Sequence, residues 1–158
     1  MGMKKIPLTQ GLFALVDDED FEWLSQWKWW IQEAGQTFYA VRGIRKNGKL
    51  TVVLMHRLII GARDEFLVDH KNGYGLDNRR FNLREATRAQ NKINVHHLNR
   101  NNTSGVTGVG WYGRTQQWRA QITVNKKVKT IGYFDDKDDA IAARKENEKR
   151  YFGEYAPQ

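Results

Sequence analysis

Residues 68–94 read VDHKNGYGLDNRRFNLREATRAQNKIN. Val68-Asp69-His70 is a candidate strand, and Asn72-Gly73 is a pair typical of tight turns. The residues that follow are too rich in Asn, Asp, Arg and Gly to form a core. From Thr87 the spacing of apolar residues predicts a helix. The stretch therefore predicts a strand, a polar loop and a helix in close succession.

Side chains in this stretch suit the hydrolysis of a phosphodiester. That reaction needs an activated water and charge neutralisation at the phosphate and the leaving oxygen. The His70 imidazole can accept the proton, and Asp69 and Asn91 offer oxygen ligands for a hard divalent cation. Because neighbours on a strand point to opposite faces, Asp69 and His70 share a site only if the strand ends or bends there. The Asn72-Gly73 turn permits such an end.

The segment 55–94 resembles the HNH nucleases, in the branch of phage and intron-encoded homing endonucleases. The residues that carry the resemblance are His56-Arg57-Leu58, Val68-Asp69-His70, Leu76-Asp77-Asn78-Arg79, Asn82-Leu83-Arg84 and Gln90-Asn91. The resemblance implies a ββα-metal fold, in which a β-hairpin and a helix hold the catalytic groups.

The resemblance also implies a role for each site residue. His70 would be the general base that activates water, and Asn82 would be a catalytic residue that fixes the loop orienting His70. Asp69 and Asn91 would be the metal ligands. Because Asn91 stands where the family's name has a His, one Mg²⁺ or Mn²⁺ ion is expected rather than Zn²⁺.

The other histidines have open or structural interpretations. His56 is compatible with a structural hydrogen bond, with support of the metal ligands or with a phosphate contact. The helix expected from Thr87 carries Ile93 and His96 or His97 on one side. His96 and His97 are interpreted as surface residues at the end of that helix.

Five arginines around the site are candidate DNA contacts. They are Arg57, Arg79, Arg80, Arg84 and Arg88. Guanidinium groups bind phosphates well, although some of these side chains are expected to form structural ion pairs instead.

The last third of the chain predicts three strands followed by a helix. The strands are expected at 108–112, 118–124 and 129–134. Asp135 or Asp136 can cap a helix that runs through Tyr151, and Gly153 supplies its end. In the middle strand Trp118, Ala120, Ile122 and Val124 alternate with Arg119, Gln121 and Thr123. This alternation predicts one face packed on the helix and one polar, basic face.

Residues 104–156 resemble the APETALA-two, or ethylene-response-factor, DNA-binding domain. The resemblance rests on Gly108-Val109, Trp118-Arg119-Ala120-Gln121-Ile122, Ile131-Gly132-Tyr133-Phe134-Asp135, Ala140 to Ala143 and Gly153. It implies a three-stranded sheet inserted into the major groove of DNA. The positions implied as DNA contacts are Trp111, Arg114, Arg119, Gln121, Thr123 and Lys129. Gly110 replaces a basic residue of the plant pattern, so base preference is not carried over.

The N-terminal third is expected to be rich in β-structure. A strand is predicted at 13–16, a short helix at 21–27, and a hairpin whose strands flank Asn47-Gly48. Four tryptophans between 23 and 30 are interpreted as core and packing residues, with base stacking as the alternative.

Composition limits the classes of function. The 158 residues carry a net charge of +8, which favours a polyanionic partner. The absence of cysteine excludes a disulfide scaffold, a thiolate zinc site and a cysteine nucleophile. Residues 1–55 have a net charge of only +1, which places the basic excess in the rest of the chain. No apolar run is long enough for a membrane span.

Together these patterns predict an α+β protein. Its expected parts are a β-rich region at 1–54, an HNH core at 55–97, a linker at 98–105 and the DNA-binding domain at 106–158. The expected function is metal-dependent cleavage of double-stranded DNA, with nicking by a monomer or weak dimer. The expected place is the cytoplasm of a bacterium or phage-infected cell, with no membrane and no small-molecule substrate.

Two other functions remain open from the sequence. A non-catalytic DNA-binding regulator would use the basic sheet equally well, but it has no need of Asp69, His70, Asn82 and Asn91 at these spacings. An RNA-binding or RNA-cleaving protein is disfavoured, because a sheet shaped for the major groove of DNA does not fit the narrow groove of A-form RNA.

Overall fold

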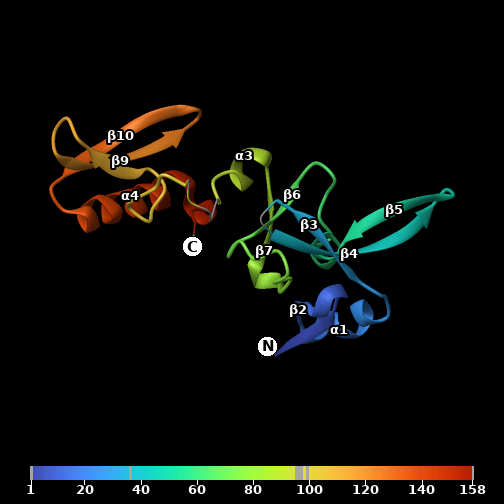
Figure 1. Ribbon diagram of the computed structural model, residues 1–158. Coiled ribbons are helices and arrows are strands. Elements are labelled where there is room, and N and C mark those ends of the chain that lie inside the picture. Colours follow the sequence, from blue (N-terminus) through green and yellow to red (C-terminus); the bar gives the residue numbers. More distant parts are fainter. Residues whose placement is uncertain (1, 36, 95–97, 99, 158) are drawn as a thin grey trace. The chain divides into compact units, whose positions relative to one another are not determined.

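The structure is a computed structural model that describes residues 2–35, 37–94, 98 and 100–157. The chain divides into two compact units, residues 1–94 and 95–157. The described residues form several small antiparallel sheets and four α-helices, so the fold class is α+β (Figure 1). None of these helices is both long and apolar enough to span a membrane.

The first unit holds seven strands, three α-helices and two 3-10 turns among its described residues. In chain order they are β1 (Met3–Pro7), η1 (Thr9–Gly11), β2 (Phe13–Asp17), α1 (Asp18–Ser25), β3 (Trp30–Ala34), β4 (Thr37–Lys46), β5 (Lys49–Leu54), α2 (Met55–Ile60), β6 (Leu67–His70), η2 (Arg80–Asn82), β7 (Leu83–Ala86) and α3 (Arg88–Asn91).

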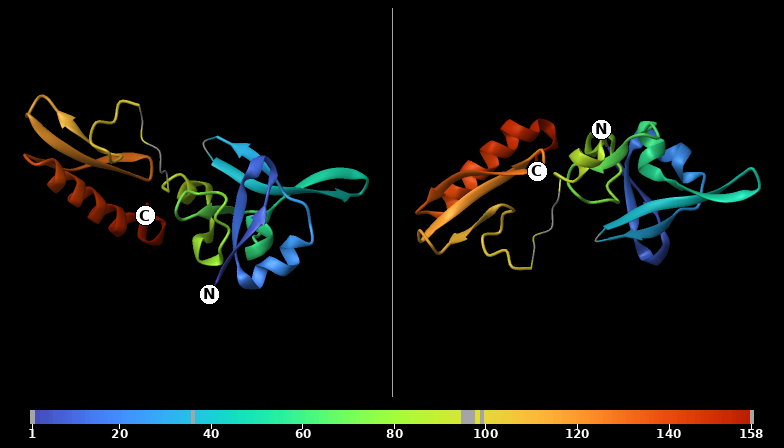
Figure 2. Two further views of the ribbon diagram at one scale, coloured as in Figure 1. Left: turned by 60° about the horizontal axis from the view of Figure 1, so that its bottom comes forward. Right: turned by 90° about the horizontal axis from the view of Figure 1, so that it is seen from above.

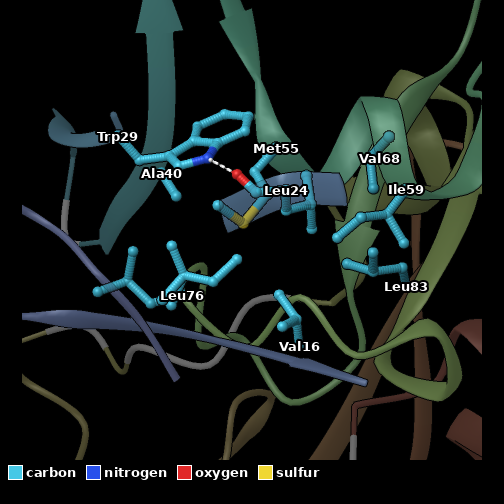
Figure 3. Close-up of a cluster of buried hydrophobic side chains, with 11 residues drawn as sticks. Val16, Leu24, Trp29, Ala40, Met55, Ile59, Val68, Leu76 and Leu83 are labelled. Atoms are coloured by element: carbon cyan, nitrogen blue, oxygen red, sulfur yellow. Dashed lines mark hydrogen bonds between the residues drawn. The ribbon is translucent and has the colours of Figure 1, made fainter. Parts of the chain in front are cut away.

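One hydrophobic core joins the N-terminal region to the segment that follows it. Figure 3 shows Val16 and Leu24 from the N-terminal region with Met55, Val68 and Leu83 from further along the chain. The indole N–H of Trp29, a buried member of the predicted tryptophan cluster, donates to the carbonyl of Leu24 at 2.8 Å. The regions 1–54 and 55–94 therefore fold as one body.

Strand β2 also binds the polar loop directly. The amide of Leu15 donates to the carbonyl of Leu76, and the amide of Asn78 donates to the carbonyl of Leu15, each at 2.8 Å. These bonds fix residues 76–78 against the core, so the loop is held although it has few apolar side chains.

Helix α1 differs from the helix predicted at 21–27. It begins at Asp18 and ends at Ser25, and three acidic residues, Asp18, Glu19 and Asp20, form its first turn. Carboxylates there are favoured by the positive end of the helix dipole. Asp17 stands at the cap position, but its side chain accepts from the amide of Arg80 at 2.8 Å rather than from the helix.

The predicted hairpin is confirmed. Strands β4 and β5 pair antiparallel around Asn47 and Gly48, which both have positive φ, at 49° and 75°. Asn and Gly tolerate this conformation better than other residues. On its other side, the first half of β4 pairs with β3.

The predicted strand, loop and helix at 68–94 are present, but the helix is shorter than expected. Strands β6 and β7 pair antiparallel, and Thr87 caps α3 in a reciprocal box with Gln90. α3 ends at Asn91, and Asn94 leaves the helical path to hydrogen-bond with β6. The prediction that Ile93 continues the helix is therefore wrong, and His96 and His97 lie outside the described residues.

The second unit has the predicted order of three strands and a helix. β8 (Val109–Tyr112), β9 (Gln117–Val124) and β10 (Lys127–Phe134) form one antiparallel sheet with β9 in the centre, and α4 (Lys137–Phe152) packs against it (Figure 2). The Asp136 side chain caps α4, and Gly153 ends it as predicted before the turn η3 (Gly153–Tyr155). Val109, Ala120 and Ala140 form the centre of a separate small core.

Candidate active site

His70 is the last residue of β6, and three side chains surround its ring. The Tyr39 ring lies parallel to it with centroids 5.7 Å apart, and the His56 ring meets it edge-on at 5.0 Å. His70 Nε2 lies 3.1 Å from Oδ1 of Asn78. Tyr39 comes from β4 and His56 from α2, so tertiary packing assembles this environment.

The contact with Asn78 determines the tautomer of His70. The Asn78 amide nitrogen donates to the sulfur of Met55, which leaves Oδ1 facing the imidazole. An amide oxygen only accepts, so Nε2 of His70 carries the hydrogen and donates it. The other nitrogen, Nδ1, then holds a lone pair and is the atom that accepts a proton.

Burial keeps both histidines neutral. Burial lowers the pKa of His70, and the hydrogen bond to Asn78 and the charges of Asp69 and Asp77 oppose this shift only in part. The pKa of His56 falls to about 3, mainly by burial and further by the neighbouring His70 and Arg57. Burial and the charge of Asp69 raise the pKa of the Tyr39 hydroxyl. At neutral pH the three rings are therefore uncharged.

Asp69 faces a different set of partners from His70. Its Oδ2 accepts from Nε of Arg84, its cross-strand neighbour on β7, at 2.7 Å. Its Oδ1 accepts from the amide nitrogen of Asn94 at 2.9 Å, and the same nitrogen donates to the backbone carbonyl of His70 at 2.9 Å. Asn94 thus joins the Asp69 carboxylate to the end of β6.

The structure places Asn94, rather than Asn91, against Asp69. Asn94 is buried, and its Oδ1 has no hydrogen-bond donor within the described residues. Asn91, expected as the second metal ligand, is the last residue of α3 and only partly buried. A buried amide oxygen without a donor next to a carboxylate suits a hard cation.

Asn82 joins the two ends of the loop 72–77 by hydrogen bonds. Its amide bonds to the backbone and side chain of Asn72 at 3.0 Å each and to the carbonyl of Asp77 at 2.8 Å. Asp77 in turn accepts from Asn72 and Arg79. Burial acts to raise the pKa of Asp77, but the bonds and charge of Arg79 and the bond from Asn72 outweigh it and lower the pKa. The loop that carries Asn78 to His70 is therefore fixed.

Most of the arginines predicted to bind DNA have partners within the chain. Arg57 donates to the carbonyls of residues 62, 63 and 66 at the end of α2. Arg79 pairs with Asp77, Arg80 with Asp20 and Glu19, and Arg84 with Asp69. Arg88 is exposed at the start of α3. Arg57 also lies 3.9 Å from Asp64, so four of these five guanidinium groups have an ion-pair partner among the described residues.

The second unit brings only part of the predicted DNA face together. Arg119, Gln121 and Thr123 alternate along β9 on the face opposite Ala120 and Ile122. The Arg119 guanidinium lies 4.6 Å from the ring of Tyr112, and Tyr133 lies beside that ring. Two aromatic rings therefore extend this polar face.

Two predicted contacts do not share that face. Trp111 pairs across the sheet with Trp118, and Lys129 pairs with Ile122, so both belong by register to the side that α4 covers. Lys129 Nζ lies 4.8 Å from the ring of Tyr151 on α4. Trp111 is nevertheless 53% exposed, at the edge strand. Arg114 is exposed in the turn between β8 and β9.

Sequence reasoning missed Tyr39, Asn78 and Asn94 as site residues. Asn78 and Asn94 both lie in residues 68–94, and the high content of Asn in that stretch is the sequence feature that could have indicated them. Tyr39 lies 31 positions before His70, and nothing in its local sequence indicates the contact. The role of His56, left open by the sequence, is now a ring contact with both Tyr39 and His70.

The chain has no match among protein-family models, curated proteins or solved structures. Within the described residues no group of three or more His, Cys, Asp or Glu side chains is arranged to hold a metal ion. At this site the Asp69 carboxylate accepts from the Asn94 amide nitrogen, and the Oδ1 of Asn94 is buried without a donor among the described residues.

Proposed function

We propose that the chain is a metal-dependent DNA endonuclease of the HNH type, with His70 as general base. The observation that carries the proposal is the neutral His70 ring, whose Nε2 is fixed by Asn78 while Nδ1 keeps its lone pair. The order β6, β7 and α3 around it is the order that the resemblance to HNH nucleases implies.

The residues present fit one hard divalent ion. Asp69 and Asn94 would hold it, in place of the pair Asp69 and Asn91. A carboxylate has about four acceptor positions, so the bonds that Asp69 accepts from Arg84 and Asn94 still leave a position for a metal. When bound, Mg²⁺ or Mn²⁺ would neutralise charge at the phosphate and at the leaving oxygen.

The chain's own residues supply the rest of the reaction. Nδ1 of His70 takes a proton from the attacking water, and Asn78 keeps the ring in the orientation and tautomer that this requires. Arg84 holds Asp69 in place across the hairpin. The rigid loop braced by Asn82 prevents Asn78 from turning away.

DNA is the proposed substrate because the chain is basic and its second unit presents Arg119, Gln121 and Thr123 on one face of a sheet. Such a face suits the major groove, where Arg and Gln read base edges. Cytoplasmic DNA of a bacterium or phage is the proposed target, cut as a nick by a single site per chain.

A specific observation also favours the alternative, a DNA-binding regulator without activity. Asp69 and His70 are each only 5% exposed, and Asp69 is already ion-paired. In a regulator these side chains would only stabilise the hairpin.

Supercoiled plasmid incubated with the protein and Mg²⁺ separates the two functions. The nuclease converts the plasmid to the open circle, and EDTA prevents this. Since a rare-cutting enzyme ignores arbitrary DNA, plasmid libraries that carry many candidate sites are included. Binding without cutting under Mg²⁺ and Mn²⁺ would favour the regulator.

A further inference from the structure

The outer half of the β4–β5 hairpin is a two-stranded ribbon. Residues 37–41 of β4 pair with β3, whereas residues 42–46 pair only with β5 among the described strands. Figures 1 and 2 show this end of the hairpin projecting beyond the rest of the first unit. We call residues 42–53 the arm.

Positive charge is concentrated on the arm and its base. Between Glu33 and Asp64 the sequence has six Lys or Arg residues and no Asp or Glu. All six acidic residues of the first 55 positions precede this stretch. The net charge of residues 1–55 is therefore low only because acidic residues, most of them in β2 and α1, offset the basic residues of the arm.

Arg45 and Lys49 are two exposed cations of the arm. Both are exposed to solvent, and no ion pair involves either side chain within the described residues. Arg42, by contrast, packs at the base, with its guanidinium 3.9 Å from the ring of Trp27. Arg42 anchors the arm, and the side chains of Arg45 and Lys49 are available to a partner.

One face of the arm carries two exposed apolar side chains, and by register Arg45 lies on the same face, directly opposite Leu50. Leu50 is 74% exposed and Val52 is 49% exposed. Both face the side of Gly43, their near neighbour on β4, where an added Cβ would lie 3.0 Å from Leu50 and 3.3 Å from Trp30. The missing side chain at Gly43 lets Leu50 lie across the ribbon toward Trp30.

We propose that the arm is a second DNA-binding element, with Arg45 and Lys49 on the phosphates and the Leu50 face in a groove. The major groove of B-DNA admits a two-stranded ribbon, and apolar side chains contact the thymine methyl group there. Charge favours DNA as the partner over a second copy of the chain. Every charged residue of the arm is basic and the chain has a net charge of +8, so two copies would repel each other. The proposal rests on the proposed function only in taking duplex DNA as ligand.

The same strand links the arm to the candidate active site. Tyr39 lies against His70, and Arg45 lies six residues further along β4. At the rise of an extended strand, this separates them by about 20 Å. One turn of DNA is about 34 Å long, so a duplex that runs along β4 would meet the arm roughly half a turn from the bond that His70 addresses.

The test is the salt dependence of binding to a labelled duplex of arbitrary sequence, measured by fluorescence anisotropy in EDTA. The full-length double variant Arg45→Gln and Lys49→Gln is compared with the parent. The control is Lys4→Gln and Lys5→Gln, which removes the same charge from β1 in the same unit.

The arm variant should lower the slope of log affinity against log salt by about 2, because each phosphate that a cation neutralises adds about 0.9 to that slope. The control should leave the slope unchanged.

Each outcome has a distinct meaning. Equal slopes for the arm variant and the control, in a parent that binds DNA, would overturn the arm proposal and leave the nuclease intact. A parent that binds no duplex would contradict the proposed function itself. If Leu50→Ser converts a dimer to a monomer by light scattering while the arm variant keeps the parental slope, the arm joins copies of the chain and the proposal fails.

Discussion

At the residue scale, the two nitrogens of the His70 ring have different roles: Nε2 donates a hydrogen bond, and Nδ1 keeps a lone pair that can accept a proton. Asn78 occupies Nε2, and the buried ring stays neutral. A base must be unprotonated before it can act, so burial prepares His70 for the role proposed. The neighbouring rings of Tyr39 and His56 restrict its movement.

Asn94→Ala should raise the Mg²⁺ concentration needed for half-maximal cutting by tenfold or more, because it removes the buried oxygen beside Asp69. Asn91→Ala is the matched change three residues away and should have a smaller effect. A titration of plasmid nicking against Mg²⁺ measures both. A larger rise in the required Mg²⁺ concentration for Asn91→Ala would show that Asn91, as the sequence predicted, is the second metal ligand.

Acid should destabilise the first unit through His56. Its pKa is about 3 in the folded chain and about 6.5 when unfolded, so the unfolded chain binds more protons as the pH falls. Stability is therefore complete above pH 6.5 and decreases below it, by about 1 kcal/mol between pH 7 and 5.5. His70 shifts in the same direction and adds to the loss.

His56→Phe keeps a flat ring but cannot be protonated, so it should lose less stability than the parent over this interval. Urea unfolding followed by tryptophan fluorescence at the two pH values gives the comparison. Identical losses in parent and variant would show that His56 is not neutral in the fold.

At the scale of elements, the turn into β8 depends on Gly108. Its φ is +81°, and an added Cβ would lie 2.4 Å from the carbonyl of Gln121 on β9. Gly108→Ala should therefore destabilise the second unit by about 2 kcal/mol or more.

Gly110→Ala is the control for that change. Gly110 lies two residues later, on β8, in open space and without a positive φ, and its substitution should alter stability by less than about 0.5 kcal/mol. Thermal unfolding of both variants tests the prediction. Equal melting temperatures would mean that the close approach of β8 and β9 is not required.

Local sequence patterns predicted the helices and strands well, but they did not predict the side-chain contacts between segments that are far apart in the sequence. The Asn47-Gly48 hairpin and the three strands and helix of the second unit follow from turn residues, alternation and caps, which act over a few positions. The end of α3 depends on the bond between Asn94 and Asp69, which spans 25 positions. The ring of Tyr39 reaches His70 only through the packing of β4, and no local pattern contains that information.

At the scale of the whole molecule, the two units have separate hydrophobic cores within the described residues. They should therefore unfold in separate transitions. Hydrogen exchange measured by mass spectrometry should show Gly108→Ala weakening protection in β8, β9 and α4 while protection in the first unit stays unchanged. Equal loss of protection in both units would show that they fold as one.

The proposed division of function follows the same boundary. The first unit would carry both cleavage and the arm, and the sheet of the second unit would add sequence preference. Within the first unit, cleavage would depend on a single residue, His70, whose Nδ1 would accept the proton.

The most direct test compares His70→Ala with the parent in two measurements on the same target DNA. One is metal-dependent nicking of supercoiled plasmid, and the other is duplex affinity in EDTA. If His70 is the general base, nicking is abolished while affinity and its salt dependence are preserved. Undiminished nicking, or loss of binding to the same extent as cutting, would contradict the assignment of His70 as the base.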